Sequence, residues 1–152
     1  MSDNYRRARW DKGWSAIEDV CHLRGWWVEI GHNPDFPRPY CVHFSGSGRY
    51  FKTLRDAHAY CRGRKWMSGP DTIPVDADRC LREGWDLVEM IRCRKGGNVS
   101  ILHAPMSEQP YLVLNRGRGY PFRSIHEARA FCYGRGWLTN STMIYKEVAN
   151  AV

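Results

Sequence analysis

The chain contains an internal repeat, which constrains its fold more than any other feature. Residues 51–66 read FKTLRDAHAYCRGRKW, and residues 122–137 read FRSIHEARAFCYGRGW. A shift of 71 positions aligns residues 39–66 with 110–137 without a gap, and 12 of the 28 aligned positions are identical. Internal similarity of this kind predicts two copies of one structural unit.

A second match lies upstream at a different spacing. The segment VCHLRGWWVEI at 20–30 resembles RCLREGWDLVEM at 79–90, with an offset of 59 to 60 positions. In this alignment Glu29 and Glu89 occupy equivalent strand positions, and the second copy carries about a dozen additional residues. We therefore expect residues 93–110 to form an inserted hairpin and loop with a Gly-Gly turn.

The repeated block contains the start and the end of a short helix in each copy. Thr53 and Ser124 each stand three residues before a carboxylate. This arrangement caps a helix, because the hydroxyl and the carboxylate satisfy free backbone N–H groups at its start. Apolar residues then follow at helical spacing. We expect Gly63 and Gly134 to end these helices by adopting a left-handed conformation.

Short β segments precede each of these helices. Two of them flank a glycine-rich turn, and a third lies upstream. Ser15 and Glu18 form a further capping box, so we expect a helix over 15–25 and a corresponding helix over 76–84. The expected fold is α+β, a tandem repeat of two small α-β-β-β-α modules whose antiparallel sheets each pack on a short helix. The expected divisions are a basic aromatic arm at 1–14, a first module at 15–66, a linker at 67–75, a second module at 76–137 and a C-terminal tail at 138–152.

The composition is that of a globular, basic chain. Hydrophobic residues make up 43% of the sequence, and 23 Lys and Arg against 16 Asp and Glu give a net charge of +7, which favours phosphates or acidic surfaces as partners. No apolar run approaches the roughly 20 residues of a membrane span. The polar N-terminus has no secretory signal. We expect a cytoplasmic protein without a membrane partner, whose six cysteines are reduced core residues.

The sequence has no recognisable catalytic motif. It contains no phosphate-binding Walker loop, no G-x-G-x-x-G between a strand and a helix, and no G-x-S-x-G. We therefore expect that the protein is not an enzyme, and that it uses no cofactor and no small-molecule substrate.

The run F-x-[ST]-x-x-[DE]-A follows a β-hairpin in both copies, at 51–57 and 122–128. It resembles nucleic-acid binders built from a three-stranded sheet and a helix, such as the ethylene-response type of plant DNA-binding domain and the arm-binding domains of phage integrases. The element order also resembles double-stranded RNA-binding domains, although the basic helix start of that family is absent here. These resemblances imply a fold used for binding nucleic acid.

Three groups of residues are candidate contacts for phosphate or for an acidic partner. The hairpin turns SGSGR and RGRGY expose backbone N–H groups beside arginines, the N-terminal arm interleaves arginines with aromatics, and an arginine follows each helix-ending glycine. The candidates are Arg49, Arg116 and Arg118 at the turns, Arg6, Arg7, Arg9 and Trp10 in the arm, and Arg64 and Arg135 after the helices. The alternatives are solvated turns, a frayed terminus, and arginines that only neutralise helix ends while Trp66 and Trp137 close the core.

Four side chains could form a zinc site across a strand and the following helix. Cys41 and His43 share a strand face, and His58 and Cys61 share a helix face. The second copy has leucine, leucine and arginine at the first three equivalent positions, so it must fold without a metal. We therefore favour a scatter of free cysteine and histidine side chains over a metal site.

Two hypotheses for function follow from these observations. The first is a non-enzymatic nucleic-acid-binding protein, for DNA or RNA, whose two modules present a sheet face or a hairpin tip. The second is a protein-binding adaptor or inhibitor, of the kind encoded by phages and mobile elements, that recognises an acidic or nucleic-acid-containing complex. A contiguous basic stripe across both modules favours the first hypothesis, and arginines scattered around an aromatic patch favour the second.

Overall fold

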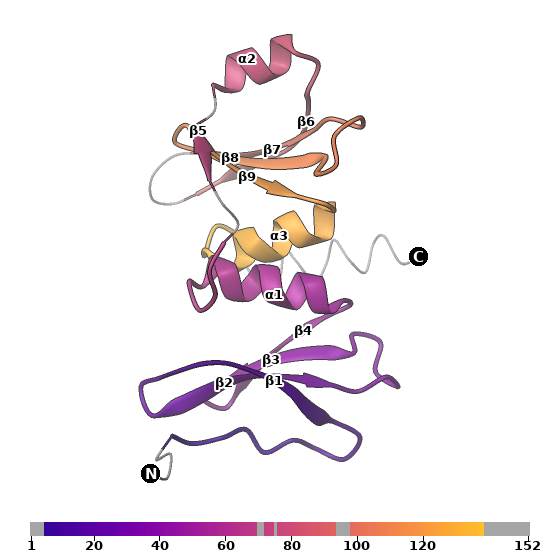
Figure 1. Cartoon of the computed structure of the whole chain (residues 1–152), viewed down its shortest axis with the longest axis vertical. Helices are drawn as coiled ribbons and strands as arrows, with labels where there is room; N and C mark the ends of the chain where they lie inside the picture. Colours follow the sequence, from indigo (N-terminus) through magenta and orange to yellow (C-terminus); the bar gives the residue numbers. More distant parts are fainter. Residues whose placement is uncertain (1–4, 70–71, 75, 94–97, 139–152) are drawn as a thin grey trace.

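The structure is a computed structural model that describes residues 5–69, 72–74, 76–93 and 98–138. Within these residues it contains nine strands and three helices (Figure 1). The first module consists of β1 (Ser15–Leu23), β2 (Trp26–His32), β3 (Tyr40–Phe44), β4 (Ser47–Phe51) and α1 (Leu54–Gly63). Its antiparallel strands lie in the order β1-β2-β3-β4.

The second module repeats this arrangement with two additional elements at its start. It consists of β5 (Ile73–Pro74), α2 (Ala77–Arg82), β6 (Asp86–Arg92), β7 (Asn98–His103), β8 (Tyr111–Asn115), β9 (Arg118–Phe122) and α3 (Ile125–Gly134). Its strands lie in the antiparallel order β5-β9-β8-β7-β6. The expected α+β class is confirmed, with two tandem modules that each pack an antiparallel sheet on a short helix.

The capped starts of the repeated helices are also confirmed. The hydroxyl of Thr53 accepts a hydrogen bond of 3.0 Å from the backbone N–H of Asp56. The hydroxyl of Ser124 accepts one of 3.1 Å from the N–H of Glu127. Both helices therefore begin where the sequence indicates, because the cap is a local interaction.

The segment expected to be a helix over 15–25 is a strand instead. β1 pairs with β2 along its length, and its register shifts twice, between Ala16 and Glu18 and between Asp19 and Cys21. A β-bulge places neighbouring residues on the same side of a strand. Val20 and Cys21 accordingly both pack against the core. Bulges therefore disrupt the two-residue alternation that identifies a strand. The corresponding expectation for the second copy is confirmed, because α2 begins after its N-cap Asp76.

The two modules are related by one uniform shift of 71 positions. β6 corresponds to β1 and β7 to β2, and the bulge between Leu87 and Glu89 repeats the one between Ala16 and Glu18. The upstream match at 59 to 60 positions was therefore wrong, and Glu89 corresponds to Glu18. Residues 93–110 are not an insertion, since β7 lies between β6 and β8 as β2 lies between β1 and β3. The expected Gly-Gly turn at 96–97 lies outside the described residues.

The modules share one core and meet through their helices. Figure 1 shows α1 and α3 side by side in the middle of the molecule, with one sheet on each side. Buried residues from both sheets and both helices belong to a single apolar cluster that includes Val42, Cys61, Val113 and Cys132. The two copies are therefore parts of one folded unit, and the inner face of each sheet is buried against its helix.

Gly63 and Gly134 lie at the closest contact between these helices. A Cβ atom on Gly63 would collide with the carbonyl oxygen of Phe131, and one on Gly134 would collide with that of Tyr60. The expectation that these glycines adopt a left-handed conformation was wrong. The helix caps are the next residues, in right-handed conformation, and positive φ occurs one position later still. The repeated glycine is therefore required for helix packing.

The outer faces of both sheets are partly covered as well. In the first module, the six-membered ring of Trp10 lies directly over Gly31 of β2. In the second module, Cys80 of α2 and the neighbouring Trp85 pack on an apolar surface formed by Leu102, Leu112 and Leu114. Gly31 under an indole in the first module thus corresponds to Leu102 under a helix in the second. None of the described helices has the length and apolar composition needed to cross a membrane.

Candidate nucleic-acid interface

Residues 5–14, which we call the arm, are attached to the first module by specific bonds. The N–H of Arg6 donates to the carbonyl of Gly25 at 2.7 Å, and the N–H of Trp27 donates to the carbonyl of Arg6 at 2.8 Å. Further along, Oε2 of Glu29 accepts a hydrogen bond of 2.8 Å from the N–H of Ala8. Glu29 is only 2% exposed, so this buried carboxylate holds the arm on the sheet.

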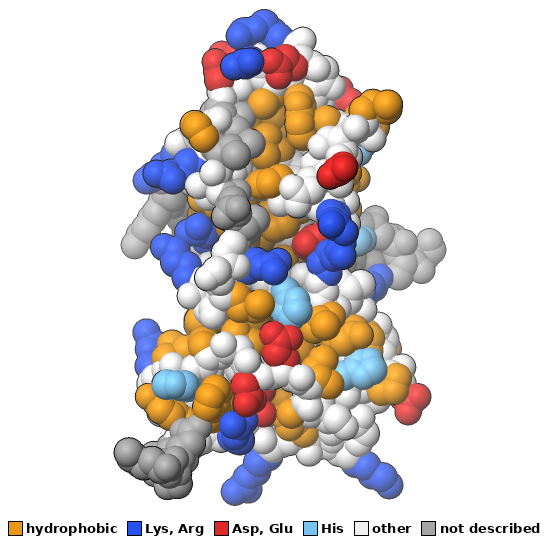
Figure 2. Space-filling model, in the orientation of Figure 1, with side chains coloured by type: hydrophobic (Ala, Val, Ile, Leu, Met, Phe, Trp, Pro, Cys, Tyr) orange, Lys and Arg blue, Asp and Glu red, His pale blue; other side chains and the backbone are white. Residues whose placement is uncertain are grey.

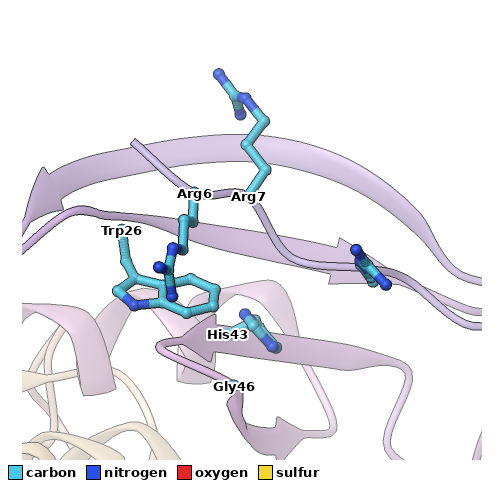
Figure 3. A pocket seen from close by; sticks show the side chains of 6 residues that line it. Arg6, Arg7, Trp26, His43 and Gly46 are labelled. Carbon is cyan, nitrogen blue, oxygen red and sulfur yellow. The ribbon is translucent and has the colours of Figure 1, made fainter. Parts of the chain in front are cut away.

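The arm and the β3–β4 hairpin flank an open groove of about 640 Å³, which we call the arm groove. It is lined by Arg6, Arg7, Arg9, Trp26, His43 and Gly46. Figure 3 shows Arg6 extending over the indole of Trp26, whereas Arg7 extends away from it. The guanidinium carbon of Arg6 lies 5.6 Å from the centre of the Trp26 ring, within the range of a cation–π contact.

Arg7 has an anchoring position in this groove. Its guanidinium binds the carboxylate of Asp19 at 2.9 Å and lies 3.7 Å from that of Glu29. It also stacks 4.6 Å from the ring centre of Trp27. Arg7 therefore fixes the backbone of the arm, and Arg6 and Arg9 are the groove arginines better placed to meet a ligand.

His43 lies at the base of the arm groove. Its ring centre is 5.7 Å from that of Trp10 and 6.4 Å from that of Trp26. Nδ1 is buried and has no hydrogen-bond partner among the residues that the structure describes. Burial lowers the pKa of His43, and the nearby charge of Glu29 opposes this change. The imidazole is therefore neutral at pH 7 and can gain a positive charge in acid.

A second, smaller pocket of about 260 Å³ lies where α1 ends, and we call it the helix-end pocket. It is lined by Val42, Phe44, Ser45, Ser47, Arg49, Tyr60, Arg64 and Trp66. The guanidinium carbon of Arg64 lies 4.7 Å from the ring centre of Trp66. Arg49 donates to the carbonyl of Gly48 at 3.0 Å. Two predicted arginines, Arg49 and Arg64, are thus brought together with aromatic rings.

The equivalent place in the second module is filled. Tyr120 takes the position of Arg49, and its ring centre lies 4.9 Å from that of Phe131. Arg135, the equivalent of Arg64, lies 5.6 Å from the ring centre of Trp137 and donates to the hydroxyl of Tyr120 at 3.4 Å. Arg135 therefore makes local contacts at its own helix end, as the alternative interpretation of these arginines expects.

The remaining predicted arginines lie apart from both pockets. Arg116 and Arg118 are exposed at the turn between β8 and β9, where Arg116 has a φ of 51°. The structure therefore does not bring all predicted residues into one site. Sequence reasoning had missed Trp26 and the anchoring role of Glu29, because both act on an arm about 20 residues away in the chain.

The covered sheet faces change what the family resemblance implies. A module that presents its open sheet face to nucleic acid needs that face free. Here Trp10 lies over one sheet and Trp85 packs on the other. Docking through an open sheet face is therefore obstructed in both modules.

The four candidate zinc ligands are not brought together. Cys41 and His43 lie on the outer face of β3, where Cys41 contacts Tyr50 and His43 contacts Trp10, whereas Cys61 lies in the core. No group of three metal-binding side chains occurs among the described residues. All six cysteines are described and have free thiols, and burial raises the pKa of Cys41 to about 11 and that of Cys61 to about 12.

Comparison with known proteins identifies no relative. No protein-family model, no curated protein and no solved structure matches the chain significantly. The function must therefore be argued from the geometry of the chain itself.

Proposed function

We propose that the protein binds nucleic acid through the arm groove and catalyses no reaction. The observation that carries this proposal is the convergence of arm arginines with Trp26 and His43 beside the first hairpin turn. Guanidinium groups match phosphate geometry, and the half-buried indole of Trp26 offers a surface on which any base can stack. The net charge of +7 adds a long-range attraction to polyanions.

The proposal includes a cytoplasmic location. Six free thiols, four of them buried, suit a reducing compartment. The cytoplasm also contains the nucleic acids that such a groove would bind.

Fluorescence anisotropy with single- and double-stranded DNA and RNA tests this proposal. We expect the logarithm of the binding constant to fall linearly with the logarithm of the salt concentration. The slope should be about −2 if three phosphates of a single strand are contacted. The double variant Arg6→Ala/Arg9→Ala should bind at least ~10-fold more weakly. Arg79→Ala/Arg82→Ala, which removes the same charge from α2, is the matched control. Absence of binding to all four ligands at about 50 mM salt would refute the proposal.

A second candidate function is the protein-binding adaptor or inhibitor, favoured by the exposed edge strand β6. Leu87, Val88 and Met90 are 50%, 47% and 53% exposed, and β6 pairs on one side only among the described residues. An unpaired apolar edge can accept a strand from a partner. On the face in Figure 2, Lys and Arg side chains are dispersed among apolar ones, a distribution that also suits this candidate. Val88→Lys should abolish such binding without changing nucleic-acid affinity.

A further inference from the structure

We propose that the ligand is a single strand of nucleic acid that crosses the turn between β3 and β4, from the arm groove into the helix-end pocket. This inference rests on the proposed function, and it adds the strandedness of the ligand and a second contact site. The two pockets are formed by the arm and the first module. They would bind neighbouring nucleotides of one strand.

The two pockets lie on opposite sides of the short turn between β3 and β4. β3 ends at Phe44 and β4 begins at Ser47, so only Ser45 and Gly46 connect them. Both have positive φ, 52° and 80°, as in the tight two-residue turns that join antiparallel strands. Gly46 lines the arm groove, and Ser45 and Ser47 line the helix-end pocket. A strand that leaves one pocket therefore meets the other after crossing one turn.

Both pockets contain the same pair of groups. Arg6 lies over Trp26 at 5.6 Å in the arm groove, and Arg64 lies over Trp66 at 4.7 Å in the helix-end pocket. An indole can stack a base while the adjacent guanidinium binds a phosphate. Two such pairs on either side of a turn match the alternation of base and phosphate along a strand.

The geometry favours a single strand over a duplex. Bases of a duplex are stacked inside it and cannot reach two indoles. A duplex is also stiff over about 150 base pairs, so it cannot bend around a two-residue turn at small cost. A single strand can do both. DNA and RNA share this chemistry, and the experiment tests them separately.

The second module supplies an internal control. Tyr120 fills the space that is open beside Arg49, and Arg135 donates to its hydroxyl. The residue 71 positions after Trp26 is Gly97, so the second copy has no equivalent indole in its sequence. Arg64→Ala and Arg135→Ala remove the same charge from equivalent helix ends. Only the first should change binding.

The experiment is an anisotropy series with oligo-dT and oligo-rU of increasing length and a duplex of matched length. We expect affinity to rise up to about four to six nucleotides and the duplex to bind at least ~10-fold more weakly than the longest single strands. Arg64→Ala should weaken these single strands at least ~5-fold and leave dinucleotide binding unchanged. Arg135→Ala should have the affinity of the unmodified protein. Thermal unfolding establishes that both variants fold.

The outcomes separate the two proposals. Equal affinity for duplex and single strand, or equal effects of Arg64→Ala and Arg135→Ala, would overturn the inference while nucleic-acid binding stands. Absence of binding to every ligand would overturn both. Tight binding by only one of oligo-dT and oligo-rU, with the Arg64 effect present, would support the inference and identify the sugar.

Discussion

Glu18 on β1 and His58 on α1 form a hydrogen-bonded pair, with 2.7 Å between Oε1 and Nε2. The equivalent residues of the second module, Glu89 and Arg129, form the same strand-to-helix pair at 2.9 Å. The second pair is more buried, with side chains 15% and 9% exposed against 34% and 23% in the first. The duplication thus preserved the pair while its basic residue and its environment changed.

This difference predicts unequal effects of removing the two carboxylates. Glu89→Gln leaves the charge of Arg129 buried, so we expect a loss of about 3 kcal/mol in the free energy of unfolding. Glu18→Gln breaks a more exposed pair and should cost about 1 kcal/mol or less. Urea denaturation of both variants measures the difference. Equal losses would show that burial does not determine how much each pair contributes to the free energy of unfolding.

The helix junction predicts strong intolerance of side chains at its glycines. Gly134→Ala would force α1 and α3 apart, and we expect a loss of about 3 kcal/mol in the free energy of unfolding. Arg55→Ala on the exposed surface of α1 is the control and should change stability by about 0.5 kcal/mol or less. An unchanged melting temperature for Gly134→Ala would contradict the close helix contact.

The environment of His43 predicts pH-dependent ligand binding. Because burial lowers the pKa of His43, the imidazole becomes charged only below the ordinary histidine value of about 6.5. We expect affinity for oligonucleotides to increase as the pH falls from about 7 to about 5, since the groove gains a positive charge.

The lowered pKa of His43 also makes the stability of the fold depend on pH. The unfolded chain binds this proton more readily than the folded one, so acid in this window lowers the contribution of His43 to stability. His43→Gln should therefore reduce both the gain in oligonucleotide affinity and the loss of stability that acid causes. A pH profile of binding that is identical in this variant would exclude His43 as the titrating group.

The buried carboxylate of Glu29 predicts how the arm can be released. Glu29→Leu removes the acceptor for Ala8 and the neighbour of Arg7, so the arm should detach. We expect trypsin to cleave at the arm arginines at least ~10-fold faster, and oligonucleotide affinity to fall although no arginine has been removed. Glu29→Gln retains a hydrogen-bond acceptor, so its cleavage rate and its affinity should lie between those of the unmodified protein and those of Glu29→Leu. Unchanged cleavage in Glu29→Leu would mean that the arm is held elsewhere.

Sequence reasoning succeeded where a feature depends on residues close in the chain. The caps at Thr53 and Ser124 and the helix after Asp76 could be predicted, because a cap involves only three or four neighbouring residues. The repeat itself predicted two similar modules. The strand over 15–23 was missed because its bulges are defined by the pairing with β2, which local spacing does not reveal.

The candidate site shows the same division. The basic character of the arm, the first hairpin and the helix ends was readable, since it depends on composition and turn residues. Which arginines converge depends on contacts between segments that are distant in the chain.

By itself the sequence determined the duplication, the capped helices and the excess of positive charge, all of which follow from local patterns. Only the tertiary structure decided that Gly63 and Gly134 pack two helices together, because their partners lie about 70 residues away. It also decided that the outer faces of both sheets are partly covered and that Arg49 and Arg64 share a pocket. Contacts of this kind depend on how distant segments pack, and local sequence patterns do not contain that information.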